Sequence, residues 1–174
     1  MRSKFAVTGL TAVLLFTLAF LIYALKNFHT VQIKGESMEP TLQPGDRLLI
    51  SKAYWLVGDI TQNDIAVFRN PEGGEPLIKR VIGLGGDPIN FEVAPTSWSI
   101  QRGEYRVPEG TYYAVGDNRP VSEDSRNLGP FDTGSVIGKV VARENDIWIV
   151  APLAVGLIAF AALLLTRNRR KAEA

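Results

Sequence analysis

Two long uncharged apolar runs, one near each end of this 174-residue chain, constrain its fold more than any other feature. The first covers residues 5–25 and the second covers residues 147–165. As helices they would measure about 31 and 28 Å, which is enough to cross the hydrocarbon core of a bilayer. We therefore expect a transmembrane helix at each end, with residues 26–146 forming one domain between them.

Basic residues flank both runs on their outer sides. Arg2 and Lys4 precede the first run, and a basic tail at 167–171 follows the second. Basic residues mark the cytoplasmic side of a membrane. We expect residues 1–4 and 166–174 to be cytoplasmic and residues 26–146 to lie outside the cell membrane. The alternatives are a cleavable signal peptide, whose apolar region is usually about 7–15 residues, and a buried core helix for the second run.

The composition narrows the chemistry available to the domain. Its net charge of +1 gives no reason to expect nucleic acid as a partner. Cysteine is absent, which excludes disulfides, thiolate catalysis and zinc–thiolate sites, and one histidine, His29, cannot build a His-rich metal centre. We expect neither a metal nor a cofactor.

The middle of the chain alternates short apolar stretches with turn signals. The stretches are rich in β-branched and aromatic residues, which favours strands. Residues 44–46, 70–74, 85–88 and 108–110 contain the Gly, Pro, Asp and Asn residues typical of turns. We expect a mainly β fold, an antiparallel and barrel-like domain of about 120 residues, with strands at 31–33, 47–50, 64–68, 77–82, 111–115 and 136–141.

Three segments carry candidate chemistry. Ser37 lies where a strand turns into a loop, although an ordinary turn serine has the same pattern. Lys79 shares a strand face with Leu77 and Val81, so burial would lower its pKa toward that of a general base. An edge-strand lysine that prevents aggregation is the alternative. The third segment is a polar loop at 116–129.

Five blocks of sequence together resemble the type I signal peptidases of bacteria, which are serine proteases with a Ser/Lys dyad. The resemblance covers most of the middle domain. The blocks occur in the family's order, at residues 37–42, 44–52, 63–68, 78–87 and 116–126. The first contains Ser37-Met38-x-Pro40-Thr41-Leu42, and the fourth contains Lys79.

The resemblance implies a role for each of these residues. Ser37 is the nucleophile, and neutral Lys79 is its general base. Ser122 resembles the serine that orients the lysine amine, and Gly116 the small residue packed close to the site. Asp124 and Arg126 resemble a structural ion pair. The residues that resemble the walls of the substrate-binding site are Ile33, Met38, Leu42, Leu77 and Ile78.

Two features depart from the family or compete with this assignment. Gly35 stands where some members have a serine that stabilises the oxyanion, which leaves the Ser37 backbone N–H as the identified donor. His29 is a competing candidate for the base, because a related branch of the family uses histidine in that role. An extended chain would place it roughly 26 Å from Ser37, so a position near the membrane surface fits His29 better.

The resemblance implies an enzyme that removes signal peptides from exported preproteins after small residues, at Ala-x-Ala sites. Its partners would be secretory preproteins, the lipid bilayer and the protein-translocation machinery. Two alternatives stay open. One is a related Ser/Lys peptidase with a single dedicated substrate, such as a pilin, and the other is a catalytically silent β domain that binds peptides.

Overall fold

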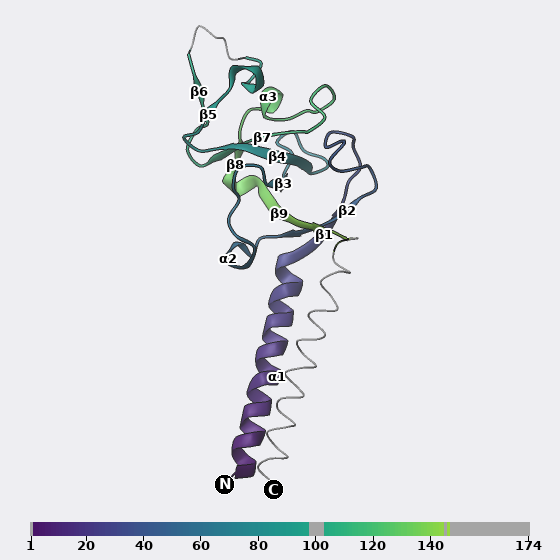
Figure 1. Ribbon diagram of the computed structural model, residues 1–174, viewed down its shortest axis with the longest axis vertical. Coiled ribbons are helices and arrows are strands. Elements are labelled where there is room, and N and C mark those ends of the chain that lie inside the picture. The colour runs from purple at the N-terminus through teal and green to yellow at the C-terminus, as the bar shows by residue number, and fades with distance from the viewer. Residues whose placement is uncertain (1, 98–102, 145, 147–174) are drawn as a thin grey trace.

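The computed structural model describes residues 2–97, 103–144 and 146. Helix α1 (Arg2–Asn27) extends away from a β domain, which begins at the next residue with β1 (Phe28–Gln32) (Figure 1). The expected first span, residues 5–25, lies within α1. Of the helices in these ranges, none is both long and apolar enough to cross a membrane. The expected second span (147–165) and the tail (166–174) lie outside the described residues.

Seven strands form one antiparallel sheet in the order β1-β2-β9-β3-β4-β7-β8. This confirms the prediction of a mainly β, antiparallel domain. Strands occur at five of the predicted positions, where β-branched and aromatic residues alternate with others. Their bounds, with that of the additional strand β8, are β2 (Arg47–Ser51), β3 (Ile65–Phe68), β4 (Leu77–Leu84), β7 (Thr111–Val115), β8 (Phe131–Asp132) and β9 (Val136–Arg143).

The first strand differs from its prediction at 31–33. It covers 28–32 and pairs with β2 from Phe28↔Ser51 to Gln32↔Arg47. Ile33 leaves the ladder because its backbone bonds to the turn at 45–46 instead. Its N–H donates to the Asp46 carbonyl at 2.9 Å, and its carbonyl accepts from the Gly45 N–H at 2.8 Å. This turn fixes the start of the segment that leads to Ser37.

The sheet bends at three irregularities in register, between Leu49 and Ile50, Val67 and Phe68, and Val81 and Gly83. Such bulges increase the local twist and curve the strand. The two faces of the bent sheet carry separate cores, as neighbouring residues of β3 demonstrate. Val67 belongs to a cluster with Ile33, Met38, Leu42, Leu48, Ile50 and Ile78, whereas Ala66 and Phe68 belong to one with Ile60, Val81, Ala114, Phe131 and Val136.

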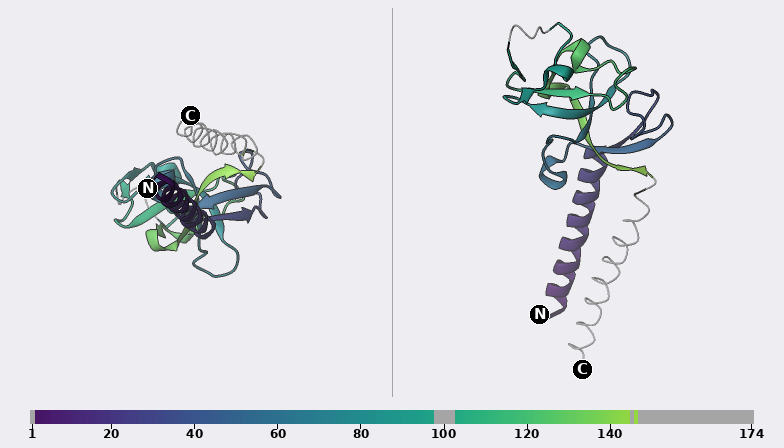
Figure 2. Two further views of the ribbon diagram at one scale, coloured as in Figure 1. Left: turned by 90° about the horizontal axis from the view of Figure 1, so that it is seen from below. Right: turned by 45° about the horizontal axis from the view of Figure 1, so that its top comes forward.

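A smaller part of the domain was not predicted. Strands β5 (Pro88–Ile89) and β6 (Tyr105–Arg106) pair with each other, and a third cluster joins them to β7. This part lies at the far end of the domain from α1 (Figures 1 and 2). The short helical elements are α2 (Tyr54–Val57), α3 (Ser125–Leu128), η1 (Phe91–Val93) and η3 (Thr133–Ser135). Elements of two to four residues are too short to display a period in sequence.

Candidate active site

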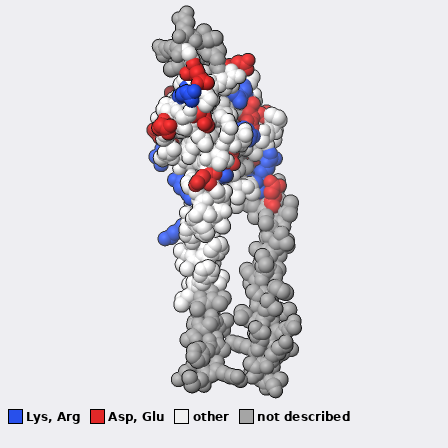
Figure 3. Space-filling view, turned by 60° about the vertical axis from the view of Figure 1, so that its left-hand side comes forward, with Lys and Arg blue, Asp and Glu red and all other residues white. Residues whose placement is uncertain are grey.

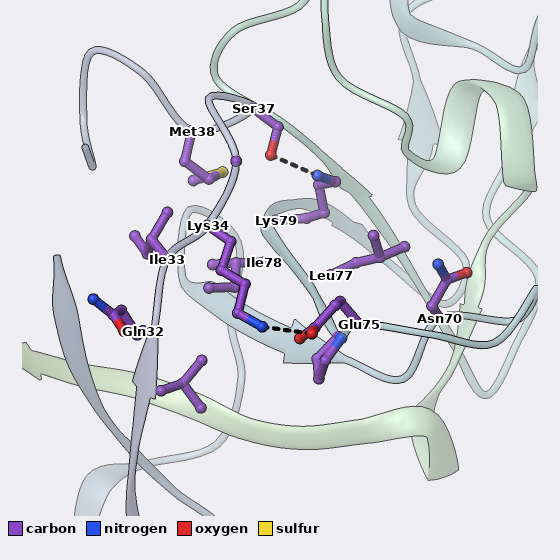
Figure 4. Close-up of a pocket in the computed structure, with 13 residues that line it drawn as sticks. Gln32, Ile33, Lys34, Ser37, Met38, Asn70, Glu75, Leu77, Ile78 and Lys79 are labelled. Atoms are coloured by element: carbon purple, nitrogen blue, oxygen red, sulfur yellow. Dashed lines mark hydrogen bonds and ion pairs between the residues drawn. The ribbon is translucent and has the colours of Figure 1, made fainter. Parts of the chain in front are cut away.

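Ser37 and Lys79 lie side by side, although 42 positions separate them in the chain. Ser37 lies in the turn that follows Ile33, and Lys79 is the third residue of β4. The Lys79 Nζ donates a hydrogen bond of 2.8 Å to the Ser37 Oγ (Figure 4). An amine and a hydroxyl at this distance can exchange a proton directly, provided that the amine is neutral.

Burial favours the neutral form of Lys79, whose side chain lies in an interior strand. Because β4 lies between β3 and β7, the alternative of an edge-strand lysine is wrong. Lys79 is only 2% exposed, and this burial lowers its pKa below the ordinary lysine value. The carboxylates of Asp124 and Glu123 oppose the shift, whereas the Arg126 guanidinium adds to it. The net effect is a lysine that gives up its proton more readily than one in water.

The loop after β7 holds the Ser37 backbone in place. The Asn118 N–H donates to the Ser37 carbonyl at 3.0 Å, and the Asn118 side-chain amide donates to the Glu36 carbonyl at 3.1 Å. Gly116 makes this close approach possible. A Cβ on Gly116 would lie 2.6 Å from the Ser122 Cβ, and closer still to the Ser122 Oγ and the Ser37 carbonyl oxygen. Only glycine fits this position without displacing Ser37 or Ser122.

The same loop contains a buried ion pair between Asp124 and Arg126. The Arg126 Nε and Nη2 donate to the two carboxylate oxygens at 2.8 and 2.9 Å, and the Asp124 side chain is fully buried. Asp124 also accepts the Gly116 N–H at 2.9 Å, and Arg126 donates to the Arg119 carbonyl at 2.8 Å. Despite burial, these contacts hold the pKa of Asp124 below its ordinary value. The pair therefore fixes the shape of the loop that contacts Ser37.

Ser122 lies next to Gly116 and is buried. Its Oγ contributes to lowering the pKa of Asp124. Within the described residues, however, the Ser122 Oγ is a buried atom without a well-formed hydrogen-bond partner. The structure thus places Ser122 beside the site without a hydrogen bond to Lys79, and its orienting role stays a prediction.

A cavity of about 270 Å³ opens beside Ser37 and Lys79. Four of the five residues expected to contact substrate line it, namely Ile33, Met38, Leu77 and Ile78. They come from the segment after β1 and from the start of β4 (Figure 4). Leu42 does not line this cavity, and it packs inside the cluster that also contains Met38.

Comparison with known proteins identifies the family. The model of the family described as signal peptidase, peptidase S26, matches residues 4–97 and 92–144. The chain belongs to this signal peptidase family. The match confirms the resemblance seen in the five sequence blocks, and membership makes the chain a serine endopeptidase of the bacterial type I signal peptidase kind.

Several named signal peptidases are similar to this family member. Signal peptidase I of Bacillus licheniformis is 35% identical over 146 residues, which cover 70% of this chain and 78% of that protein. Signal peptidase I V of Bacillus subtilis strain 168 is 31% identical, covering 67% and 86%. A crystal structure of a signal peptidase I from Enterococcus faecalis V583 is 29% identical, with a TM-score of 0.39, and covers 48% of this chain and 97% of that one.

Two contacts near the site were not predicted for this signal peptidase family member. Asn118, whose N–H donates to the Ser37 carbonyl, belongs to the polar loop at 116–129, but the sequence did not predict its contact with Ser37. Arg80 forms a bidentate ion pair with Asp117, at 2.8 and 2.6 Å, and so joins β4 to the same loop. Arg80 shares its strand face with Ile78 and Ile82, and an arginine in such an apolar context is a signal for a charged partner, but the sequence alone did not identify which one.

His29, the histidine considered as an alternative base, belongs to β1 and does not line the cavity beside Ser37. His29 is exposed, and its Nε2 lies 3.0 Å from the Lys26 carbonyl at the start of the β domain. In the part of the chain that the structure describes, no group of three or more His, Cys, Asp or Glu residues could hold a metal ion.

Proposed function

We propose that this chain removes signal peptides from exported preproteins, with Ser37 as nucleophile and Lys79 as general base. The observation that carries the proposal is the 2.8 Å contact between the Lys79 Nζ and the Ser37 Oγ, formed by a buried lysine whose pKa is lowered. Membership in the signal peptidase family supports the substrate class.

In the proposed reaction, the Ser37 Oγ attacks the carbonyl carbon of the scissile peptide bond while its proton moves to the neutral Lys79 amine. The resulting oxyanion accepts a hydrogen bond from the Ser37 N–H, which donates no other hydrogen bond within the described residues. The C–N bond then breaks, and the Lys79 ammonium returns the proton to the leaving amine. A water molecule, deprotonated by Lys79, hydrolyses the ester and releases the signal peptide.

The cavity walls support a preference for small residues at the cleavage site. Ile33, Met38 and Ile78 are each at most 9% exposed, so the wall that they present to the cavity is apolar and carries no charge. Small apolar residues such as alanine suit such a wall better than charged ones, and the resemblance to type I signal peptidases implies the same preference. We therefore propose cleavage after Ala-x-Ala sequences.

We also propose that the protein is anchored in the cell membrane by residues 5–25 and 147–165, with both ends cytoplasmic. The uncharged runs and their basic flanks support this topology. The described part of α1 exposes a series of large apolar side chains, and its surface in Figure 3 is almost free of charge. Where α1 meets the domain, Tyr23 and the exposed Trp55 pack together, an aromatic pair suited to a membrane interface. Residues 26–146 would then act outside the cell.

The test compares cleavage of a signal-peptide substrate by the full chain in lipid or detergent. We expect Ser37→Ala to abolish turnover and Lys79→Ala to reduce kcat by about 10²–10⁴-fold. Lys52→Ala, which changes an exposed lysine outside the cavity, should match wild type. If both dyad variants kept wild-type activity, the assignment of Ser37 and Lys79 would be wrong.

The pH dependence provides a second test of the lysine base. Only neutral Lys79 can accept the proton, so activity should be low below its pKa and rise as the pH passes through it. Because burial lowers that pKa, activity should rise at a lower pH than it would if the base were an ordinary lysine. Flat activity between about pH 5 and 9 would refute a lysine base. Cleavage of many preproteins rather than one would exclude a dedicated processing enzyme.

A further inference from the structure

Lys34 and Glu75 form an ion pair across the cavity beside Ser37. Lys34 is the second residue after β1, and Glu75 is the second residue before β4. The Lys34 Nζ and the Glu75 Oε1 are 2.5 Å apart, and both residues line the cavity. In Figure 4 the pair connects the wall that contains Ile33 with the wall that contains Leu77.

Both charged side chains are accessible to a ligand. They are 66% and 70% exposed, and within the described residues neither side chain forms another hydrogen bond or ion pair. An exposed ion pair contributes little net stability, so a charged group on a bound peptide can replace either partner at small cost. The pair thus differs from the buried ion pair of Asp124 with Arg126, which a ligand cannot reach.

The position of the pair indicates which part of a substrate it meets. Glu75 precedes Lys79 by four residues, or about 13 Å of extended chain. The cavity wall between them is largely apolar, with Ile33, Leu77 and Ile78. A second opening shares Lys34, Leu77, Ser37 and Lys79 with the first, and its remaining lining includes Glu36 and Glu123. Glu75, Ile33 and Ile78 line only the first. An apolar signal peptide suits the first opening, and the polar start of a mature protein suits the second.

We propose that Lys34 and Glu75 form a charge-compensated subsite for the substrate residue about four positions upstream of the scissile bond. This inference rests on the proposed function of the site. With both charges present, a cationic substrate residue can pair with Glu75 and an anionic one with Lys34. The subsite therefore tolerates either sign, and removal of one partner makes it selective for the sign that the remaining partner attracts.

The experiment uses the full chain in detergent and three peptides that differ only at this upstream position, which holds Lys, Glu or Gln. The enzymes are wild type, Lys34→Gln, Glu75→Gln and the charge-swapped double variant Lys34→Glu/Glu75→Lys. Glu72→Gln is the matched control, because it makes the same chemical change in the same loop outside the cavity lining. The readout is the ratio of kcat/KM for the Lys peptide to that for the Glu peptide.

We expect a ratio near one for wild type, the control and the charge-swapped variant. Glu75→Gln should lower the ratio and Lys34→Gln should raise it, each by about two- to fivefold through KM, as expected for exposed charge pairs. High salt should bring both ratios back toward one. A merely structural role would change all three peptides equally.

The same ratio in all five enzymes would overturn the subsite while leaving the dyad intact, since the Gln peptide would still be cleaved. A second set of peptides carries the charge downstream of the scissile bond. If the kcat/KM ratio shifted equally for these peptides, the subsite would also be overturned, because the effect would then be long-range. Loss of cleavage of the Gln peptide in wild type would instead refute the proposed function itself.

Discussion

Gly116→Ala tests whether close packing against the Ser37 backbone positions the nucleophile. The added Cβ would lie 2.6 Å from the Ser122 Cβ and closer than that to the Ser37 carbonyl oxygen, whereas ordinary contact begins at 3.4 Å. The neighbours must therefore retreat by about 0.8 Å or more. A rotated side chain cannot relieve the contact with Ser37, because the atom concerned belongs to the backbone.

The magnitude of the effect follows from the contact between Ser37 and Lys79. A retreat of this size along the 2.8 Å hydrogen bond would stretch it to about 3.6 Å, which is no longer a hydrogen bond. A misplacement near 1 Å costs about 10²-fold in rate. We also expect overpacking to destabilise the domain by about 1–3 kcal/mol, which leaves most of the protein folded.

The assay measures kcat/KM on a signal-peptide substrate together with the unfolding temperature. Gly134→Ala is the matched control, because nothing lies within 4 Å of the Cβ that it would add and the backbone there suits any residue. We expect the control to match wild type and Gly116→Ala to lose about 10²-fold in kcat/KM while still unfolding cooperatively. A Gly116→Ala enzyme within twofold of wild type would show that this packing does not position Ser37.

Two further predictions concern Asp124 and Gly35. Asp124→Asn breaks the buried pair with Arg126 and should cost about 3–5 kcal/mol at neutral pH, measured by denaturant unfolding. Because the folded pKa of Asp124 is lowered, its stabilisation is present above about pH 4 and is lost as the pH falls through the folded pKa, and the Asn variant should lack this loss. Gly35→Ser meets nothing within 4 Å, so the unfolding temperature should not change. Since the Ser37 N–H is the one donor identified for the oxyanion, a second donor from the new hydroxyl should raise kcat by about tenfold, part of the 10²–10³-fold that one donor can contribute, and an unchanged or lower kcat would contradict this.

The sequence predicted the larger strands and the turns between them, since alternation over four to eight residues is a strong local signal. It did not predict β5 and β6, whose two residues each cannot alternate detectably. It also could not distinguish a cavity wall from a core position. Leu42 and Met38 both follow Ser37 and both are apolar, but only the tertiary structure shows that Met38 reaches the cavity.

The pairing of Ser37 with Lys79 could be predicted only through family resemblance. Local patterns made each residue only a weak candidate. The pattern of the strand that contains Lys79 does not predict which loop lies beside it, and Ser37 is 42 positions away in the chain. The ion pairs of Arg80 with Asp117 and of Lys34 with Glu75 were missed for the same reason. Charge pairing across 37 or 41 positions depends on strand order and register, which hydrophobic periodicity does not encode.

One loop controls both the position and the protonation state of the proposed dyad. At its start, Gly116 contacts the Ser37 carbonyl and donates its N–H to Asp124. At its end, Asp124 is held by Arg126 and raises the pKa of Lys79, against the larger effect of burial. The carboxylate that fixes the loop against Ser37 thus also limits how far the lysine pKa can fall. Neutralising Asp124 would weaken the contacts that hold the loop against Ser37 and would also lower the pKa of Lys79, which makes Lys79 a weaker base. A change at Asp124 therefore alters the position of Ser37 and the basicity of Lys79 together.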